Sequence, residues 1–447
     1  MTKWTEEQML AIVKGNTNII VSAGAGSGKT AVLTQRVITN LKKGMHINEL
    51  LILTFTNNAA MEMKTRIKKA ILEDDEIKNE AKLTDSDDIT TFDAYVLSLV
   101  KKYHYLLNLD SDITLIDSSI IKKKKKDFIE EIFEELFTQK NEKFIKFVTD
   151  FGTKNARQTK KTILNLDYSF DLITKKEDYL NNYIESYYNK NNLDNLFHQF
   201  ENTLLKRVES IKNLLLNLSF EVDSDYYDKI YKTLEPLLKS SNYQEIRSNL
   251  DFKLSPLRNA SDKAKYYKEQ ISKIIKDLKS LTEFHEQVLK DDLLKTKEYA
   301  EVIIEILLKL TQKVNAYKFE YQVFEFNDIS KFALKILDEN EDIRKELKNY
   351  YKEIMIDEYQ DTSDVQEQFI KYIENNNVYM VGDIKQSIYR FRNANPDIFK
   401  IKYDAYKDGN NGFKIDLNKN FRSRGEVLDS INQIFNHIMD DNIGNAN

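Results

Sequence analysis

The residues with the clearest chemical potential lie near the start of the chain, where Ala23 to Thr30 read A-G-A-G-S-G-K-T. The common phosphate-binding pattern is G-x-x-x-x-G-K-[ST], and alanine replaces its first glycine here while the spacing is kept. Glycines let backbone N–H groups point at phosphate oxygens without Cβ clashes. Lys29 suits the β and γ phosphates, and the Thr30 hydroxyl suits Mg²⁺. The stretch predicts an ATP and Mg²⁺ site built from Ala23, Gly24, Ala25, Gly26, Ser27, Gly28, Lys29 and Thr30.

Two adjacent carboxylates follow an apolar run much later, in E-I-M-I-D-E-Y-Q-D-T (353–362). Asp357 suits a Mg²⁺ ligand that acts through water, and Glu358 suits the base that polarises an attacking water. A solvated acidic turn is the alternative interpretation of such a pair. Together with the glycine-rich loop, however, the pair predicts hydrolysis of a nucleoside triphosphate, with Thr30 and Asp357 at the metal and Lys29 and Glu358 as catalytic residues.

Short apolar runs precede these residues and recur in both flanks of the chain. Such runs suit buried strands of a parallel sheet, with helical segments between them. Open α/β sheets bind ligands beyond the carboxyl ends of their strands, and polar residues follow each run here. The sequence therefore predicts an α/β fold with its chemistry along one edge of a parallel sheet. The predicted strands are N-I-I-V-S (18–22), E-L-L-I-L-T (49–54), D-I-T-T-F (88–92), E-I-M-I-D (353–357), V-Y-M-V-G-D (378–383) and F-K-I-D-L (413–417).

The middle of the chain has a different character. Gly152 is the only glycine between Gly44 and Gly382, and Lys, Glu, Leu, Ile and Asn are abundant. Few helix breakers, and apolar residues three and four apart, predict helices from about residue 105 to about residue 320. The lysine run Lys122 to Lys126 could add salt-dependent affinity for DNA phosphates, or it could form a solvated helix face. Both interpretations stay open at this point.

Composition limits the class of protein. With 447 residues, two or three domains are expected, and the net charge of −5 neither requires nor forbids a nucleic-acid partner. The absence of cysteine excludes disulfides and thiolate metal sites and suits a reducing cytoplasm. No apolar run is long enough to cross a bilayer, and the start lacks the shape of a signal peptide. We therefore expect a cytoplasmic protein with no membrane partner.

Several short motifs in a fixed order resemble one family. D-E-Y-Q-D, G-D-I-K-Q-S-I-Y-R-F-R and N-F-R-S follow the A-G-A-G-S-G-K-T loop in the order seen in UvrD/Rep-like superfamily 1 DNA helicases. The resemblance covers the first hundred residues and those after about 324. The segment V-F-E-F-N-D-I-S-K-F-A-L-K-I-L (323–337) is similar to the helicase–nuclease branch of this family, the AddA-type subunits.

The resemblance implies roles at the nucleotide. Gln8 resembles the glutamine that hydrogen-bonds adenine, and Phe421 resembles the aromatic residue that stacks on it. Gln386 resembles the residue that senses the γ-phosphate. Arg422 resembles the arginine finger that reaches the γ-phosphate from the second motor domain. The alternatives are a plain surface glutamine for Gln8 and a surface salt bridge for Arg422.

The resemblance also implies contacts to single-stranded DNA. G-D-I-K-Q-S-I-Y-R-F-R then touches nucleotide at one end and DNA at the other, which gives hydrolysis a physical route to strand movement. An aromatic ring there can stack on any base. The alternative is that Ile388, Tyr389 and Phe391 are core residues. The implied DNA contacts are Phe55, Thr56, Asn57, Tyr389, Phe391 and Arg392.

At the level of domains, the resemblance implies an α/β fold with a RecA-like P-loop NTPase sheet interrupted by a large all-helical insertion, followed by the start of a second RecA-like domain. The predicted limits are residues 1–104 and 325–405 for the first motor domain, 105–324 for the insertion and 406–447 for the second motor domain. Because the second motor and an AddA-type nuclease are not present, the chain is expected to be the N-terminal part of a longer protein.

The function that the resemblance implies is that of a 3′-to-5′ ATP-dependent DNA helicase, as one subunit of a helicase–nuclease in double-strand break repair and recombination. Its partners would be single-stranded or duplex-end DNA and a second, AddB-type subunit. One alternative is a nucleotide-gated DNA-binding or scaffolding module that does not translocate. Another is a P-loop ATPase with a task unrelated to nucleic acid, which Gln386, Arg392 and Arg422 argue against.

Overall fold

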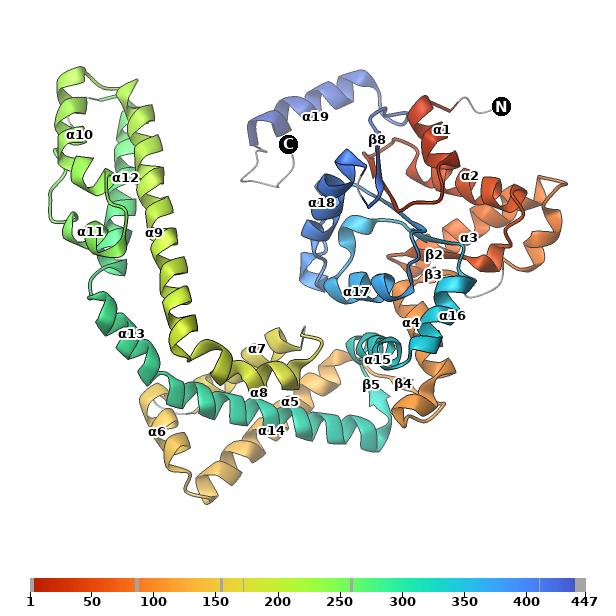
Figure 1. The fold of residues 1–447 in the computed structure, drawn as a ribbon, viewed down its shortest axis with the longest axis horizontal. Helices are drawn as coiled ribbons and strands as arrows, with labels where there is room; N and C mark the ends of the chain where they lie inside the picture. Colours follow the sequence, from red (N-terminus) through yellow and green to blue (C-terminus); the bar gives the residue numbers. More distant parts are fainter. Residues whose placement is uncertain are drawn as a thin grey trace. The chain divides into compact units, whose positions relative to one another are not determined.

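Six strands form one parallel sheet in the order β3-β2-β6-β7-β1-β8. Figure 1 labels β2, β3 and β8 of this sheet. Neighbouring strands pair in parallel across the sheet. Every residue of β2 and of β7 is buried, as expected when helices cover both faces. The predicted α/β fold class is confirmed. The strands are β1 (Ile19–Ala23), β2 (Leu50–Thr54), β3 (Ile89–Thr91), β6 (Glu353–Ile356), β7 (Val378–Gly382) and β8 (Phe413–Leu417).

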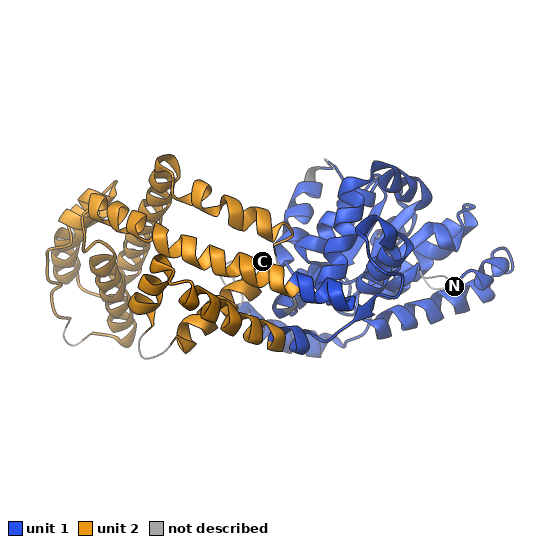
Figure 2. Ribbon diagram, turned by 90° about the horizontal axis from the view of Figure 1, so that it is seen from below, with its two compact units in different colours: residues 1–122, 315–447 blue, residues 123–314 orange. Residues whose placement is uncertain are grey.

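The chain divides into two compact units (Figure 2). Unit 1 holds residues 1–122 and 315–447, and unit 2 holds residues 123–314. Every site residue predicted from the sequence belongs to unit 1. The computed structural model describes residues 4–84, 88–152, 156–171, 173–257, 260–409 and 411–438. No helix within these ranges combines the length and the apolar character that a membrane span needs.

The sheet of unit 1 separates two hydrophobic cores. In β1, Ile19 and Val21 belong to one core and Ile20 belongs to the other, because side chains alternate along a strand. The first core is closed by α1 (Glu6–Val13), α2 (Lys29–Lys42) and α3 (Asn57–Leu72). The second is closed by α4 (Phe92–Lys102), α15 (Phe326–Glu339), α16 (Glu341–Tyr350), α17 (Asp364–Ile373) and α18 (Pro396–Ala405).

Short elements complete unit 1 around these layers. A second, two-stranded parallel sheet pairs β4 (Thr114–Leu115) with β5 (Val323–Phe324). The last described helix is α19 (Gly425–Ile438). The 3-10 helices are η1 (Ile47–Glu49), η2 (Lys78–Lys82), η3 (His104–Leu107), η4 (Tyr359–Asp361), η5 (Ile384–Gln386), η6 (Arg390–Arg392) and η7 (Tyr406–Asp408).

The position of β8 differs from the sequence-based prediction for residues 406–447. The prediction placed this strand in a second motor domain, whereas β8 pairs with β1 from Ile19↔Phe413 to Ala23↔Leu417. Ile415 and Leu417 are buried in the same core as α1 and α2. Two inward-facing apolar side chains and a full parallel ladder therefore place β8 at the edge of the first sheet.

Unit 2 is all-helical in its described part, which agrees with the prediction for the middle of the chain. The chain enters it along α5 (Ser118–Thr138) and leaves it along α14 (Lys297–Tyr321). Between these two helices lie α6 (Glu142–Phe151), α7 (Arg157–Phe170), α8 (Lys176–Tyr187), α9 (Lys190–Ser219), α10 (Ser224–Leu238), α11 (Tyr243–Ser248), α12 (Asp262–Leu281) and α13 (Glu286–Lys295). The main hydrophobic core of the unit joins α9, α10, α11 and α12.

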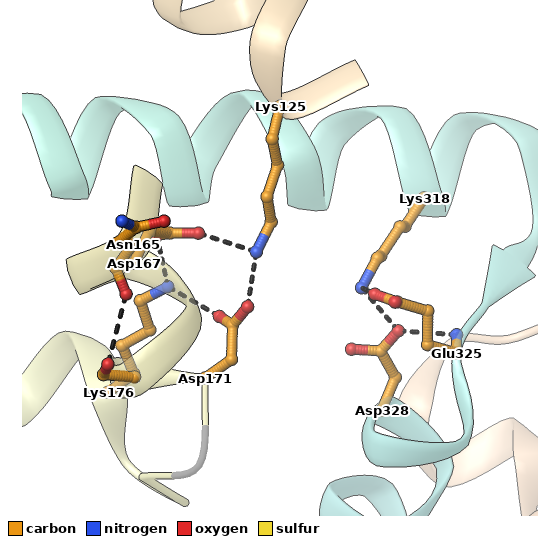
Figure 3. Close-up of polar contacts among 9 residues, drawn as sticks. Lys125, Asn165, Asp167, Asp171, Lys176, Lys318, Glu325 and Asp328 are labelled. Atoms are coloured by element: carbon orange, nitrogen blue, oxygen red, sulfur yellow. Dashed lines mark hydrogen bonds and ion pairs between the residues drawn. The ribbon is translucent and has the colours of Figure 1, made fainter. Parts of the chain in front are cut away.

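Unit 2 is shorter than the insertion predicted at residues 105–324. Pairing of β4 with β5 keeps the chain on both sides of the insertion within unit 1. At the return point, Lys318 Nζ lies 2.9 Å from Glu325 Oε2 and 2.6 Å from Asp328 Oδ2 (Figure 3). These contacts tie the end of α14 to the start of α15.

The lysine run on α5 contains a buried member that neither predicted role describes. Lys125 pairs with Asp167 at 2.6 Å and with Asp171, and Lys176 pairs with both aspartates at 2.6 and 2.7 Å (Figure 3). Burial alone would raise the pKa of Asp171, but Lys125 and Lys176 outweigh it and hold the pKa below its ordinary value. Lys125 is thus a structural cation that joins α5 to α7 and α8, while Lys126 is exposed.

Candidate functional site

The predicted site residues follow the carboxyl ends of the central strands of unit 1. The glycine-rich loop follows β1, the acidic pair follows β6, and the Gln386 segment follows β7. Phe55 follows β2, and Phe421 and Arg422 come four and five residues after β8. In a parallel sheet these strand ends share one edge. The predicted location of the chemistry therefore matches the topology of the sheet.

The loop after β1 has the backbone conformation that its glycines permit. Gly26 and Gly28 have φ angles of +75° and +88°, in the left-handed region that favours glycine. Gly28 forms the cap before α2, so Lys29 and Thr30 are the first two residues of that helix. Ser27 is buried, and its hydroxyl has no hydrogen-bond partner within the described part of the chain. A buried polar atom in a glycine-rich loop before a helix fits a phosphate-bearing ligand.

Gln8 is attached to this loop. It is buried, and its Nε2 donates a 2.9 Å hydrogen bond to the Ser27 carbonyl. The Thr5 side chain and the Gln8 side chain also form a reciprocal cap at the start of α1. The helix that carries Gln8 is therefore fixed to the loop, which is not the arrangement of a plain surface glutamine.

Glu358 faces Lys29 across the site. Lys29 Nζ lies 3.3 Å from Glu358 Oε2, and both side chains retain some exposure. Glu358 has a φ of +51°, which is uncommon for a residue with a side chain and is typical of functional sites. The structure thus brings together the two residues that the sequence predicts to act on the terminal phosphate, although they are 329 positions apart.

Asp357 directly follows β6 and precedes Glu358. Burial raises its pKa to about 6, and the neighbouring Glu358 carboxylate adds to the rise. Its Oδ1 accepts a 3.0 Å hydrogen bond from the Glu358 N–H. A carboxylate that is costly to ionise in the protein alone is suited to a divalent cation, and Mg²⁺ prefers oxygen ligands such as those of Asp357 and Thr30.

The segment after β7 continues from the same edge. Gln386 lies in η5, and its Nε2 donates a 2.7 Å hydrogen bond to Asp383 Oδ2. Gln360 from the acidic segment is buried and bonds both to Glu358 and to the Asp383 N–H. The acidic pair and the Gln386 segment are therefore joined by direct hydrogen bonds.

The segment after β8 is bound to the glycine-rich loop. Asn420 Nδ2 donates a 2.7 Å hydrogen bond to the Ala25 carbonyl, and the Phe421 N–H donates one of 2.8 Å to the Gly26 carbonyl. Asn420 Oδ1 accepts from the N–H groups of Arg422 and Ser423. Phe421 and Arg422 are both exposed, so the backbone brings them to the loop while their side chains stay accessible.

Aromatic rings gather around the predicted DNA-facing residues. The rings of Phe55 and Tyr389 have centroids 4.4 Å apart, and those of Tyr389 and Phe391 are 5.8 Å apart. Phe391 is 77% exposed and Ile388 is 68% exposed, so neither is a core residue. The structure thus joins one residue that follows β2 to two that follow β7.

The remaining predicted DNA contacts lie at the start of α3 and in η6. The Thr56 hydroxyl accepts a 3.2 Å hydrogen bond from the Ala59 N–H and caps α3, and Asn57 is the exposed first residue of that helix. Arg392 ends η6, and its side chain lies outside the described part of the structure.

Comparison with known proteins gives this geometry a family. The model of the UvrD/REP helicase N-terminal domain matches residues 4–407. This chain belongs to the UvrD/REP helicase family. It is also similar to curated proteins named as the A subunits of ATP-dependent helicase/nucleases, with 32% identity to that of Clostridium beijerinckii and 34% to that of Thermoanaerobacter sp. (strain X514). The matches cover 99% and 100% of this chain.

A third relative with the same name, from Clostridioides difficile (strain 630), is 31% identical over 99% of this chain. The chain spans about 40% of the length of these relatives. The predicted resemblance to the helicase–nuclease branch of the UvrD/REP helicases is therefore confirmed for this part of the protein.

Two residues of this UvrD/REP helicase site are not predicted from the sequence. Gln360 and Asn420 lie inside the motifs D-E-Y-Q-D and N-F-R-S, but the motifs alone assign them no role. The signal that could have found them is their residue type: each is an amide within a cluster of charged residues, and an amide can donate and accept at once. Both use this property here, since each bridges two separate segments.

Proposed function

We propose that this chain is the first motor portion of an ATP-dependent 3′-to-5′ DNA helicase, within a helicase–nuclease that acts in double-strand break repair and recombination. Its partners are single-stranded DNA, duplex DNA ends and a second, AddB-type subunit, and its compartment is the cytoplasm. The observation that carries the proposal is the arrangement at one sheet edge, where Lys29 meets Glu358 and the three aromatic rings follow the neighbouring strands.

The nucleotide side of the proposal assigns a role to each residue at that edge. The loop of residues 23–30 holds the phosphates, with Lys29 as the cation and Thr30 and Asp357 as the Mg²⁺ ligands. Glu358 polarises the attacking water. Gln386 and Arg422 respond to the terminal phosphate, while Gln8 and Phe421 hold adenine. ATP with Mg²⁺ supplies the phosphoanhydride bond that is broken.

The DNA side of the proposal rests on the rings. Stacking on an aromatic side chain is worth about 1–3 kcal/mol per base and does not depend on base identity. Phe55, Tyr389 and Phe391 offer such surfaces, and Thr56, Asn57 and Arg392 lie next to them in the sequence. A motor that must move along any sequence needs this kind of contact.

A strand-separation assay tests the proposal on the complete gene product. With ATP and Mg²⁺, a duplex with a 3′ single-stranded tail should separate, while one with a 5′ tail should not. Glu358→Gln, which removes the proposed base, is the inactive control. Separation of the 5′-tailed duplex alone would overturn the polarity. DNA-stimulated hydrolysis without separation of either duplex would favour the scaffolding function instead.

A further inference from the structure

The amide of Gln360 holds together two segments with different tasks in the proposed function, on which this inference rests. Gln360 follows β6 and is 1% exposed. Its Nε2 donates to Glu358 Oε2 at 2.7 Å and to Asp361 Oδ2 at 3.3 Å. Its Oε1 accepts from the Asp383 N–H at 2.9 Å. One buried side chain thus bonds the proposed base and the first residue of the segment that carries Gln386, Tyr389 and Phe391.

The fit around this amide is tight on the side of β7. A Cβ at Gly382 would lie 2.3 Å from Gln360 Oε1, a distance that real Cβ atoms do not show. The absence of a side chain at Gly382 therefore lets the amide reach the Asp383 N–H. The glycine of G-D-I-K-Q has a steric reason that concerns Gln360 rather than the nucleotide.

Other bonds join the same two segments further along. Ser387 Oγ donates to the Gln360 carbonyl at 3.3 Å, and the Asn395 N–H donates to the Thr362 carbonyl at 2.9 Å. Ser363 and Ala394 form an isolated antiparallel bridge. The segment with the exposed aromatic ring is thus attached to the acidic segment at both of its ends, and only the Gln360 amide also contacts Glu358 among these bonds.

We propose that Gln360 is a positioning residue that couples the base Glu358 to the DNA-facing segment, so that a change at one is transmitted to the other through a single buried amide. Coupling between two binding sites is measurable as the factor by which one ligand changes the affinity for the other. The readout is therefore the dissociation constant for oligo(dT), with and without a non-hydrolysable ATP analogue.

The test uses the complete gene product and the variant Gln360→Met, which keeps the side-chain length and removes all three hydrogen bonds of the amide. In the wild type, the ATP analogue should change the dissociation constant for oligo(dT) by about fivefold or more. In Gln360→Met, the ratio of the two dissociation constants should be close to one. The matched control is Gln366→Ala, which removes the side-chain half of the reciprocal cap of α17 in the same segment. In the described structure Gln366 has no hydrogen bond to Glu358 or Asp383. Thermal unfolding of all three proteins separates loss of coupling from loss of fold.

A second variant separates the donor contacts of the amide from its acceptor contact. Gln360→Glu keeps an acceptor for the Asp383 N–H but places a carboxylate against those of Glu358 and Asp361. It should lose turnover and, because repulsion replaces the bond to Glu358, it should also lose the effect of nucleotide on DNA affinity. Retention of that effect in Gln360→Glu would show that coupling does not need the contact to Glu358 and would contradict the inference, and an unchanged ratio in Gln360→Met would overturn it.

Failure of the proposed function gives a different result. A wild type whose hydrolysis is not stimulated by DNA, and whose DNA affinity does not respond to nucleotide, would remove the helicase proposal and this inference with it. A wild type that responds, beside a Gln360→Met variant that responds equally, would remove only the role of Gln360.

Discussion

Two groups of opposite charges, one in each unit, show how differently an ion pair can serve a protein. In unit 1, Lys29 is 12% exposed and Glu358 is 38% exposed, and Lys29 has one carboxylate partner at 3.3 Å. In unit 2, Lys125 is 5% exposed and Asp167 is 1% exposed, and two lysines share two aspartates. A ligand can replace Glu358 as the partner of Lys29, because that pair is partly exposed. In unit 2 the two lysines and two aspartates satisfy one another, so that their role is to hold helices together.

The number of ion-pair partners and the exposure of the side chains therefore distinguish a ligand-binding site from a structural ion pair, whereas the local density of charge does not. The run of five lysines has the higher charge density, yet its buried member is structural. The single lysine of the glycine-rich loop is the one for which we propose a catalytic role. Each experiment below acts on one of the two groups or on its neighbours.

The largest effect is expected at Glu358. Glu358→Gln removes the proposed base and should lower ATP turnover by about 10²–10⁴-fold, the range for general-base catalysis. Binding of fluorescent ATP should persist because the glycine-rich loop is unchanged. The comparison is Glu346→Gln, an exposed carboxylate on α16 that pairs with Lys102. Turnover that survives in Glu358→Gln would show that another group polarises the water.

Breaking the ion-pair cluster of Lys125, Lys176, Asp167 and Asp171 in unit 2 should instead lower the stability of the protein. Lys125→Met leaves the buried Asp167 and the partly exposed Asp171 with one lysine. It should lower the free energy of unfolding by about 3 kcal/mol, near the lower end for a broken buried pair because Lys176 remains. Lys126→Met, the exposed neighbour in the same run, should change it by about 0.5 kcal/mol or less. Denaturant unfolding compares the two variants. Equal effects would mean that Lys125 is not buried and paired in solution.

The free energy of unfolding should depend on pH with opposite signs at Asp357, which is next to Glu358, and at Asp171, which pairs with Lys125. Both are measured without Mg²⁺ or nucleotide. The pKa of Asp357 is raised to about 6 from 3.8, so the charged form opposes folding at neutral pH, and stability is lost as pH rises through 6. Asp357→Asn should therefore be more stable than the wild type at pH 7, on the order of 2 kcal/mol, and no more stable at pH 3.

Asp171 behaves in the reverse way. Its pKa is held below the ordinary value of 3.8, so its contribution is complete above that value and is lost as pH falls through the lower, folded-state pKa. Asp171→Asn should be less stable than the wild type at pH 7, and the deficit should shrink only in strong acid. Denaturant unfolding from pH 3 to pH 8 measures both variants. The same sign for both would contradict the comparison of the two groups.

A smaller effect is expected at the adenine side. Gln8→Ala should weaken ATP binding by about tenfold, the value of one hydrogen bond, and should reduce the preference for ATP over GTP. Thr5→Ala is the control, since it breaks the cap of α1 at a cost of about 1 kcal/mol in stability and leaves the Gln8–Ser27 contact in place. An unchanged preference in Gln8→Ala would leave Gln8 a purely structural role at the loop.

The smallest effect concerns the exposed part of the lysine run. Replacing Lys123 and Lys126 with Gln should change the slope of log affinity for single-stranded DNA against log salt by about 1.4 if both neutralise phosphates, and by nothing if they form a solvated face. Lys125 is excluded because it is buried against Asp167 and Asp171. Fluorescence anisotropy with oligo(dT) at several salt concentrations decides between the two interpretations.

Much of the sheet could be predicted from the sequence because its strands are short, continuous apolar runs. The six runs correspond to β1, β2, β3, β6, β7 and β8 within a residue or two, and the glycine-rich loop could be located from spacing alone. The sheet to which β8 belongs could not, because a run of five residues does not identify its neighbours. Its pairing with β1 depends on contacts nearly four hundred positions apart.

Side-chain partners were the least predictable level. The carboxylates that pair with the buried Lys125 belong to Asp167 and Asp171, more than forty positions away in the sequence. A lysine run by itself predicts an exposed helix face. Gln360 and Asn420 were visible inside their motifs, yet which segments they bridge depends on how the strand ends meet. The residue types showed which side chains could form hydrogen bonds or ion pairs, but the tertiary structure determines which partners they have.

The ladder between β1 and β8 has a consequence for length variation among related chains. Ala23 lies opposite Leu417, and the Phe421 N–H is bonded to the Gly26 carbonyl only four residues later. One residue added or removed between Phe413 and Phe421 would turn alternate side chains to the wrong face or shift Arg422 along the loop by about 3.3 Å. In an alignment of homologues, gaps should therefore be absent from Phe413 through to Arg422.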